Sequence, residues 1–321
     1  MIRRGMIFGC LLGPVCAARA QGRRPLIGVL EARAAPASGD SAVMAGIKAA
    51  LTAIDLREGA HYDLVARYGV QPSDLDAAAR ELVALQPAMI LTVLTPAGHA
   101  ARRATTHIPI LLAAAADPVA VGLVDSYAKP GGNVTGVAAL GTDTAAKCLQ
   151  LLREWLPKAR RVGALLNPTD PYTPTLRARL QEAARDARFE LLEAPVVDAD
   201  SIARIMADWS TQRVEAVFVQ PSLPGAPAAQ AGLQRRVPVF SFASTASLPK
   251  AGGLFSYGAS SASVYQKTAD YVRRILEGAK PADLPVQQPD RYDLVINAAT
   301  ARSLGLTVPA SLRLRASEVI D

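Results

Sequence analysis

The residues best suited to bind a small ligand gather at four points, each at the end of an apolar run and beside a proline. These points are Thr95-Pro96, Asp117-Pro118, Asn167-Pro168 and Pro221-Ser222. A helix that starts at such a point presents unpaired backbone N–H groups and a partial positive charge, which together attract anions. We therefore predict anion-binding positions where helices begin at Thr95 and Thr173.

Thr95 is the strongest candidate for binding a carboxylate. It ends an apolar run, and the sequence predicts that it caps a helix whose first residues are Pro96 and Ala97. Asp117, at the end of the next apolar run, could pair with an ammonium group of the same ligand. The alternative at each position is an ordinary helix cap, but the occurrence of two such points in each half of the chain favours a ligand cleft.

Motifs for catalysis or metal binding are missing from the sequence. There are three histidines, His61, His99 and His107, and no HExxH, CxxC, GxSxG, GxGxxG or Walker motif. His99 and His107 flank one predicted helix without the clustered acids or cysteines of a metal site, so we expect both at the solvated surface. We predict a protein that is not an enzyme and has neither cofactor nor metal.

The elements that position these residues alternate between strand and helix. Strands are predicted at residues 26–30, 62–68, 88–94 and 108–113, and the pattern begins again after Gly136 at 161–166, 189–193, 216–219 and 238–240. Amphipathic segments between them predict helices, for example at 41–54, 141–155, 173–187 and 261–277. This alternation predicts an α/β fold of two similar units, each a parallel sheet covered on both faces. The tail after residue 304 has only a weak pattern.

Composition supports two domains and excludes a strongly charged partner. The chain has 321 residues, of which 50% are hydrophobic, so it can bury a large core. The net charge of +7 includes Arg3, Arg4 and Arg19, which lie in a stretch of twenty residues without any acid. The remaining basic residues are scattered, and we predict no nucleic-acid binding.

That first stretch has the features of an export signal. Residues 1–20 combine a basic start, a short apolar run and the cleavage pattern Ala18-Arg19-Ala20, so we predict cleavage after Ala20 and a periplasmic protein. The apolar run is too short to span a bilayer. Lipidation at Cys10 or Cys16 is the alternative, although the residues before each cysteine, Ile7-Phe8-Gly9 and Gly13-Pro14-Val15, do not suit a lipidation signal. Cleavage would leave Cys148 as a single cysteine, which we expect to be a packing residue.

Several longer segments resemble one family. The segments are IPILLAAAADPVAVGLV, KPGGNVTGV, RRVGALLNP, GGLFSYG and VRRILEGAKPADLPVQQPDRYDLVINAATARSLGLTVPASLRLRASEVI. They resemble substrate-binding proteins of ABC transporters, in the group that includes tryptophan- and tyrosine-binding members. The resemblance covers most of residues 27–320. It implies a type I periplasmic binding protein, an α/β fold with two Rossmann-like lobes that have parallel sheets and are joined by three crossing segments.

The resemblance also implies lobe boundaries and partners. Lobe 1 is expected at residues 21–136 plus 258–285, and lobe 2 at 137–257 plus 286–321. A monomer should bind a small carboxylate or amino acid between the lobes and deliver it to an ABC permease in the inner membrane. The motif and the resemblance together give these ligand-binding candidates: Glu31, Thr95, Pro96, Ala97, Asp117, Asn167, Thr173, Ser222 and Tyr257.

One departure from the family limits the choice of ligand. After the first strand, where many relatives place a glutamine and a histidine-proline pair, this chain has Glu31-Ala32-Arg33-Ala34-Ala35-Pro36. The ligand of the aromatic amino-acid binders is therefore not implied. The rival functions are a sensory receptor of the same fold and a hydrolase. A cytoplasmic repressor would need an N-terminal DNA-binding helix pair where this chain has an export signal.

Overall fold

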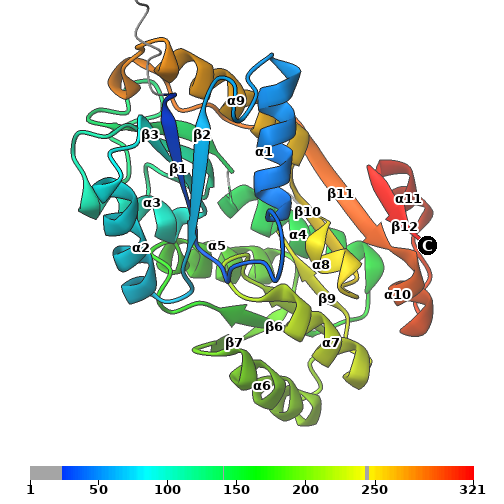
Figure 1. The fold of residues 1–321 in the computed structure, drawn as a ribbon. Coiled ribbons are helices and arrows are strands. Elements are labelled where there is room, and N and C mark those ends of the chain that lie inside the picture. Colours follow the sequence, from blue (N-terminus) through cyan, green and yellow to red (C-terminus); the bar gives the residue numbers. More distant parts are fainter. Residues whose placement is uncertain (1–23, 140, 243–245) are drawn as a thin grey trace, which may run out of the picture.

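The computed structural model describes residues 24–139, 141–242 and 246–321, which form two sheets with helices on both faces of each (Figure 1). The predicted export signal, residues 1–20, with Cys10 and Cys16, lies outside the described residues. The strand order is β2-β1-β3-β4-β5 in the first sheet and β12-β11-β10-β9-β8-β6-β7 in the second. No helix within the described ranges is both long and apolar enough to cross a membrane.

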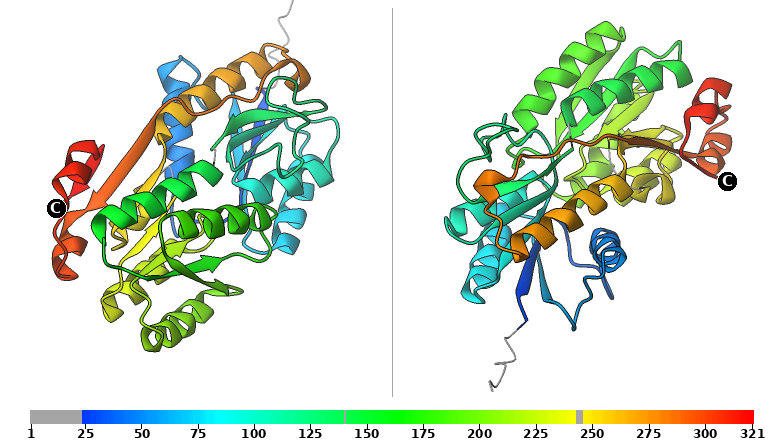
Figure 2. Two further views of the ribbon diagram at one scale, coloured as in Figure 1. Left: turned by 180° about the vertical axis from the view of Figure 1, so that it is seen from behind. Right: turned by 90° about the horizontal axis from the view of Figure 1, so that it is seen from above.

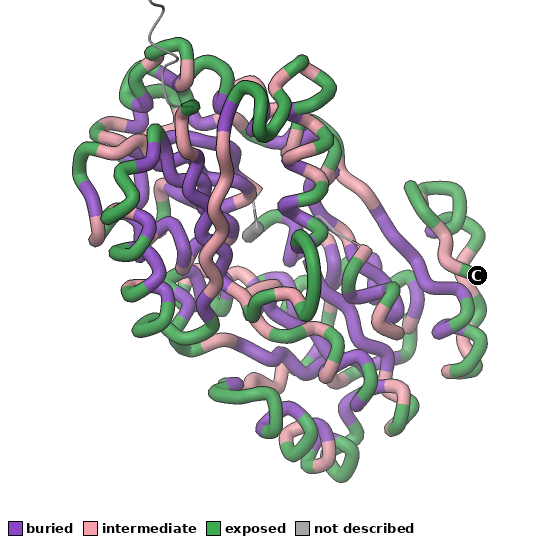
Figure 3. Tube along the Cα trace, in the orientation of Figure 1, coloured by how far each residue is buried: buried purple, intermediate pink, exposed green. Residues whose placement is uncertain are grey.

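The first sheet is parallel throughout. Its strands are β1 (Leu26–Glu31), β2 (Asp63–Tyr68), β3 (Met89–Val93), β4 (Ile110–Ala115) and β5 (Val134–Ala138). Its helices are α1 (Ala42–Ala53), α2 (Pro72–Ala84), α3 (Thr95–Ala104) and α9 (Ser261–Leu276). Successive strand residues point to opposite faces, so Ile90 packs against α2 and α3 while Leu91 packs against α1 and α9. Figure 3 shows the resulting pattern, with buried strands between more exposed helices.

The second sheet is parallel except at one pair. Its strands are β6 (Arg161–Leu166), β7 (Glu190–Pro195), β8 (Ala216–Val219), β9 (Val239–Ser241), β10 (Phe255–Ala259), β11 (Tyr292–Asn297) and β12 (Glu318–Ile320). β10 and β11 are antiparallel, because the chain leaves this sheet along β10 and returns to it along β11. The α/β prediction with parallel sheets is confirmed apart from this pair.

Helices cover both faces of the second sheet as well. They are α4 (Gly141–Trp155), α5 (Thr173–Asp186), α6 (Ala199–Thr211), α7 (Gly225–Arg235), α8 (Ser247–Lys250), α10 (Ala298–Ser303) and α11 (Ala310–Arg315), and Pro281–Asp283 forms a 3-10 turn before β11. The weakly patterned tail thus contains a short helix, α11, and a strand, β12, that pairs with β11.

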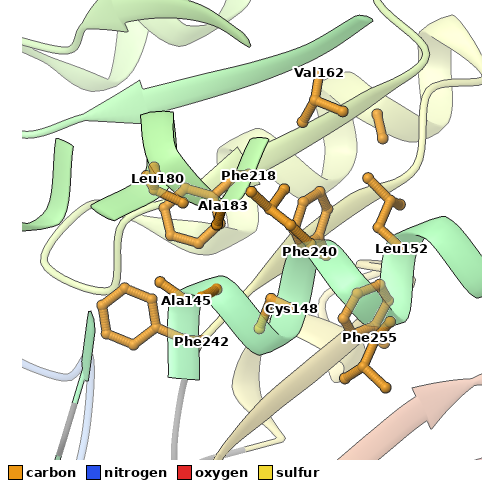
Figure 4. Close-up of a cluster of buried hydrophobic side chains, with 14 of the residues drawn as sticks. Ala145, Cys148, Leu152, Val162, Leu180, Ala183, Phe218, Phe240, Phe242 and Phe255 are labelled. Atoms are coloured by element: carbon orange, nitrogen blue, oxygen red, sulfur yellow. The ribbon is translucent and has the colours of Figure 1, made fainter. Parts of the chain in front are cut away.

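Aromatic rings form the centre of the core under α4 and α5 (Figure 4). Phe240 stacks on Phe255 at 5.1 Å between ring centroids and meets Phe218 edge-on at 5.7 Å. Cys148 is fully buried beside them, and its thiol donates to the backbone oxygen of Ser241 at 3.6 Å. The prediction that Cys148 is a packing residue is therefore confirmed.

The chain passes between the two sheets three times, after β5, after β10 and before β11. Although α9 follows a strand of the second sheet, it packs beside α1 on the first (Figures 1 and 2). Two of the connections pair with each other: Gln287 N–H donates to Gly136 O and Ala138 N–H donates to Gln287 O, both at 2.8 Å. The exact lobe boundaries remain a prediction.

A close backbone approach fixes one of these connections. Gly136 has φ +145°, and a Cβ atom placed there would lie 2.3 Å from the carbonyl oxygen of Leu112 on the neighbouring strand. Only glycine adopts such a backbone conformation freely, and only glycine lacks the atom that would collide.

Candidate ligand-binding cleft

A cavity of about 630 Å³ lies between the carboxyl ends of the strands of the two sheets. The first-sheet half contributes Arg33, Leu94, Thr95, Ala114 and Tyr265 among others, and the second-sheet half contributes Asn167, Asp170, Gln220, Ser222 and Phe242. Gly258 and Ala259, at a connection between the sheets, line it too. Ligands of open α/β folds bind outside the carboxyl ends of the strands, and pockets for small molecules measure about 300–1,000 Å³.

The backbone around the cavity holds two residues in an unfavourable conformation. Seven described residues other than glycine have positive φ, and five of them end helices, where this conformation is common: Asp55, Gln86, Arg188, Arg213 and Arg236. The remaining two, Leu94 and Ala114, both line the cavity. Ala114 interrupts the pairing of β4 with β5, so its peptide groups leave the ladder. Local strain of this kind concentrates at functional sites.

The conformation of Leu94 corrects one prediction. Leu94, with φ +71°, is the N-cap of α3, so Thr95 is the first helical residue and does not cap the helix. The positive φ turns the chain one residue earlier than the sequence suggests. Gly98 N–H donates to Leu94 O at 3.4 Å and is not available to a ligand. Thr95 lines the cavity, and its hydroxyl oxygen accepts from Ala116 N–H at 3.2 Å, which leaves the hydroxyl proton available to donate.

Arg33 is the one basic side chain among the described residues that line this cavity. Its Nε lies 3.2 Å from Oε2 of Glu31, a residue with no exposed surface, and the side chain of Arg33 is 39% exposed. Oε1 of Glu31 accepts from the hydroxyl of Ser41 at 2.5 Å. Glu31, predicted as a ligand-binding residue, thus lies behind Arg33 and does not itself line the cavity.

Asp170 is the centre of a buried polar network on the opposite side. Its Oδ2 accepts from Gln220 Nε2 at 2.9 Å and from the Ser222 hydroxyl at 2.6 Å, and its Oδ1 accepts from Tyr172 N–H at 2.9 Å. Asp170 is 6% exposed. Burial raises the pKa of Asp170 above its usual value, although the hydrogen bonds from Ser222, Tyr172 and Gln220 oppose this. No ion pair to Asp170 is found among the described residues.

Aromatic packing holds the loop that carries Asp170. Tyr172 meets Phe242 edge-on at 6.4 Å, and Phe242 stacks on Phe218 at 5.7 Å. Because Phe218 contacts Phe240 in the core, these rings connect the cavity wall to the centre of the second sheet (Figure 4). Rigid neighbours of this kind fix the position of the Asp170 carboxylate.

Comparison with known proteins identifies the family. A family model described as ABC transporter substrate binding protein matches residues 32–320. The chain belongs to this family. It is 26% identical over 235 residues to a tyrosine-binding protein of Clostridioides difficile, a match that covers 71% of this chain and spans 66% of that relative's length.

Two solved structures share the fold over nearly their whole length. A conserved domain protein from Vibrio cholerae is 27% identical, with TM-score 0.83 and coverage of 92% of this chain and 100% of the other. An ABC domain in complex with L-Trp from Streptococcus pneumoniae is 24% identical, with TM-score 0.82 and coverage of 93% and 100%. This substrate-binding protein accordingly has the type I periplasmic binding fold, with two α/β lobes.

The other predicted ligand residues of this substrate-binding protein lie in different places. Asn167 and Ser222 line the cavity, and Asn167 Nδ2 donates to the Ser222 hydroxyl at 3.3 Å. Thr173 does not line it, and its hydroxyl points into the protein and donates to Asn167 O. Pro96 lines a smaller neighbouring cavity of about 90 Å³.

Ala97, Asp117 and Tyr257 line neither cavity. The carboxylate of Asp117 instead accepts from Ala120 N–H at 3.1 Å and from the Tyr127 hydroxyl at 3.2 Å. Tyr257 stacks on Tyr292 at 5.8 Å. The strand before Asp117 does reach the cavity, through Ala114 and Ala116, but the side chain of Asp117 contacts Tyr127 instead.

His99 corrects a second prediction. It is half-buried beside the smaller cavity, and its Nε2 is a buried atom without a hydrogen-bond partner in the described chain. Burial, and then the charges of Arg103 and Arg102, lower the pKa of His99, so it is neutral at physiological pH. Within the described ranges no three His, Cys, Asp or Glu residues are grouped as metal ligands.

Two charged residues that line the cavity, Arg33 and Asp170, were not predicted from the sequence as ligand-binding residues. Asp170 lies in the sequence Asn167-Pro168-Thr169-Asp170-Pro171, where its two flanking prolines suggest only a turn. The available signal was an acidic residue in the short loop after a predicted strand. Arg33 had the corresponding signal after the first strand.

Proposed function

We propose that this protein is an exported receptor of an ABC importer and binds a small amino acid in the cleft between its lobes. The observation that carries the proposal is the 630 Å³ cavity, which both lobes line and which contains a basic group on one side and a buried acidic group on the other. Its relatives include a protein named for tyrosine binding and a structure with bound L-Trp. The rest of the cavity lining is mainly apolar, which suits the side chain of an amino acid.

The proposal includes closure of the lobes on the ligand by a hinge motion. Lobe 1 would comprise residues 21–136 and 258–285, and lobe 2 residues 137–257 and 286–321. Small-angle scattering should show a more compact particle with bound ligand and an unchanged far-UV circular dichroism spectrum. An unchanged scattering curve at saturating ligand would argue against closure.

A thermal-shift screen of amino acids, organic acids, sugars and nucleosides tests the ligand class. A ligand at a hundred times its Kd adds about 2.7 kcal/mol to the free energy of unfolding, enough to raise the melting temperature by several degrees. We expect amino acids to give the largest shifts. If only sugars or nucleosides raise the melting temperature, the proposed ligand class is wrong.

Export, transport and the absence of turnover need separate tests. We expect the protein in the periplasmic fraction with Gln21 at its N-terminus, and a substitution Ala20→Leu should block that cleavage. The bound ligand should be recovered chemically unchanged after prolonged incubation, since the proposed role is binding without reaction. Deletion of the gene should abolish uptake of the ligand through its permease, and light scattering should give the mass of a monomer.

A further inference from the structure

The charged groups of the cleft are divided between its two sides. Three charged residues line the large cavity among the described residues: Arg33 on the first-lobe side, and Asp170 and Asp198 on the second-lobe side. The two acids differ in their surroundings. Asp198 is exposed and caps α6 by accepting from Ser201 N–H at 2.6 Å, whereas Asp170 is 94% buried.

Asp170 has acceptor capacity that the protein does not use. An ionised carboxylate can accept about four hydrogen bonds. Three are made to Asp170, from the backbone of Tyr172 and the side chains of Gln220 and Ser222, and none of these donors is charged. A buried carboxylate without a cationic partner is costly, because neutral hydrogen bonds compensate only part of its lost hydration. A positively charged group in the cavity would supply the missing partner.

Arg33 shows the complementary pattern. Its Nε faces Oε2 of Glu31 at ion-pair distance, but neither atom makes an aligned hydrogen bond within the described residues. A guanidinium carries five N–H donors in a planar fork that matches a carboxylate. Thr95, on the same side of the cavity, can add its hydroxyl proton.

We propose that the cleft selects zwitterions because each lobe binds one charged group of the ligand. Arg33 binds the carboxylate and Asp170 binds the ammonium group. This inference rests on the proposed function. A ligand with both poles contacts both lobes and links them, and an analogue with one pole can contact only one side. The charge separation of the ligand therefore controls both affinity and closure.

Two competing roles for the acidic residues of the cleft are open to test. In the first, Asp170 has only a structural role and ties the loop at Asn167 to the loop at Ser222. Replacing it would then lower stability and weaken all ligands alike. In the second, Asp198 binds the ammonium group, since it lines the same cavity.

The decisive measurement uses matched probes on the unmodified mature protein. These are L-tyrosine with 3-(4-hydroxyphenyl)propanoate and tyramine, and L-leucine with 4-methylpentanoate and 3-methylbutylamine. Each set keeps one side chain and removes the amine or the carboxylate. For the amino acid that binds more tightly, we expect calorimetry to show a loss of about ten- to a hundredfold for each one-pole analogue, the size expected for one charge-assisted hydrogen bond. Scattering should show compaction with the amino acid alone.

Three outcomes of this measurement would overturn the inference. Equal binding of the amino acid and its desamino analogue would refute the role of Asp170 while leaving the proposed amino-acid receptor intact. Failure of both amino acids to bind, with binding of either simple carboxylate, would refute the role of Asp170 and also the proposed amino-acid ligand. If no probe of any kind bound, the proposed function would fail together with the inference.

Substitutions in the cleft distinguish the binding of the ligand's carboxylate from the binding of its ammonium group. Asp170→Asn should weaken the amino acid by about tenfold or more and leave the desamino analogue unchanged. Arg33→Gln should weaken both carboxylates and spare the amine. Asp208→Asn, an exposed site on α6 with the same change in charge, serves as the control and should bind like the parent.

Asp198→Ser keeps a capping residue and removes the second acid of the cavity, and we expect a smaller loss than for Asp170→Asn. Should Asp198→Ser lose more, the ammonium group belongs at Asp198. Should Asp170→Asn weaken all probes equally, its role is structural. If Asp170→Asn does not fold, the matched probes on the parent protein still decide whether the ammonium group of the ligand contributes to binding.

Discussion

Replacement of Gly136 by alanine tests the close approach between β5 and β4. The new Cβ atom would lie 2.3 Å from Leu112 O, 2.5 Å from Leu112 N and 2.7 Å from Leu112 Cα. All three are backbone atoms in the middle of a parallel sheet, so they cannot move without displacing β4. Overpacking costs about 1–3 kcal/mol, and a backbone conformation reserved for glycine costs about 1–3 kcal/mol more.

The sum, about 2–6 kcal/mol, is large against the 5–15 kcal/mol typical of a folded protein. We therefore expect the urea midpoint of Gly136→Ala, followed by circular dichroism, to fall well below that of the parent. Gly132→Ala is a matched control, because Gly132 also has positive φ, +59°, but its Cβ would meet no atom within 4 Å. That control should lose only about 1–2 kcal/mol. Equal losses for the two variants would refute the close approach.

Three further outcomes follow from single side chains. Thr95→Val removes the acceptor of Ala116 N–H, so it should lower the free energy of unfolding by about 1–3 kcal/mol and the affinity for a carboxylate about tenfold. Thr95→Ser keeps the hydroxyl and should keep both stability and affinity. Equal behaviour of the two variants in denaturation and calorimetry would contradict the hydrogen bond. Because the folded pKa of Asp170 is raised, the native state holds its proton to higher pH than the unfolded chain does, so its contribution to stability falls as pH rises from about 4 through the folded pKa. Asp170→Asn should lack this pH-dependent loss of stability. If the free energies of unfolding of the two proteins differed by the same amount at every pH, the raised pKa of Asp170 would be contradicted. Burial raises the pKa of Cys148, so Ellman's reagent should label a chain starting at Gln21 only after denaturation; labelling of the native protein would contradict its full burial.

Local patterns were sufficient to predict most elements of the fold. β6 and β8 begin and end at the residues expected from the sequence, because each contains an apolar run, at residues 162–166 and 216–219, between polar residues. The antiparallel direction of β11 was not predictable in this way. It depends on the path of the chain between the two sheets, which leaves no mark on the residues of the strand itself.

The candidate site was predictable in its location and less so in its residues. Strand ends rich in small polar residues do lie at the cavity, as Asn167 and Ser222 show. Asp170 was missed because its surroundings come from Gln220 and Ser222, about fifty residues further along the chain. The shifted start of α3 was missed because positive φ at a leucine is unfavourable and no sequence rule predicts it.

The packing of α9 on the first sheet also has a consequence for the order of folding. Ile47 of α1 and Val272 of α9 belong to one buried cluster, although more than two thirds of the chain lies between them. During synthesis the apolar face of α1 therefore stays exposed until α9 has emerged, and contacts between such distant segments form slowly. A chain that ends before α9 cannot complete even its N-terminal lobe. An incomplete chain should thus remain unfolded, which is the state in which a protein can still be passed through a narrow export channel.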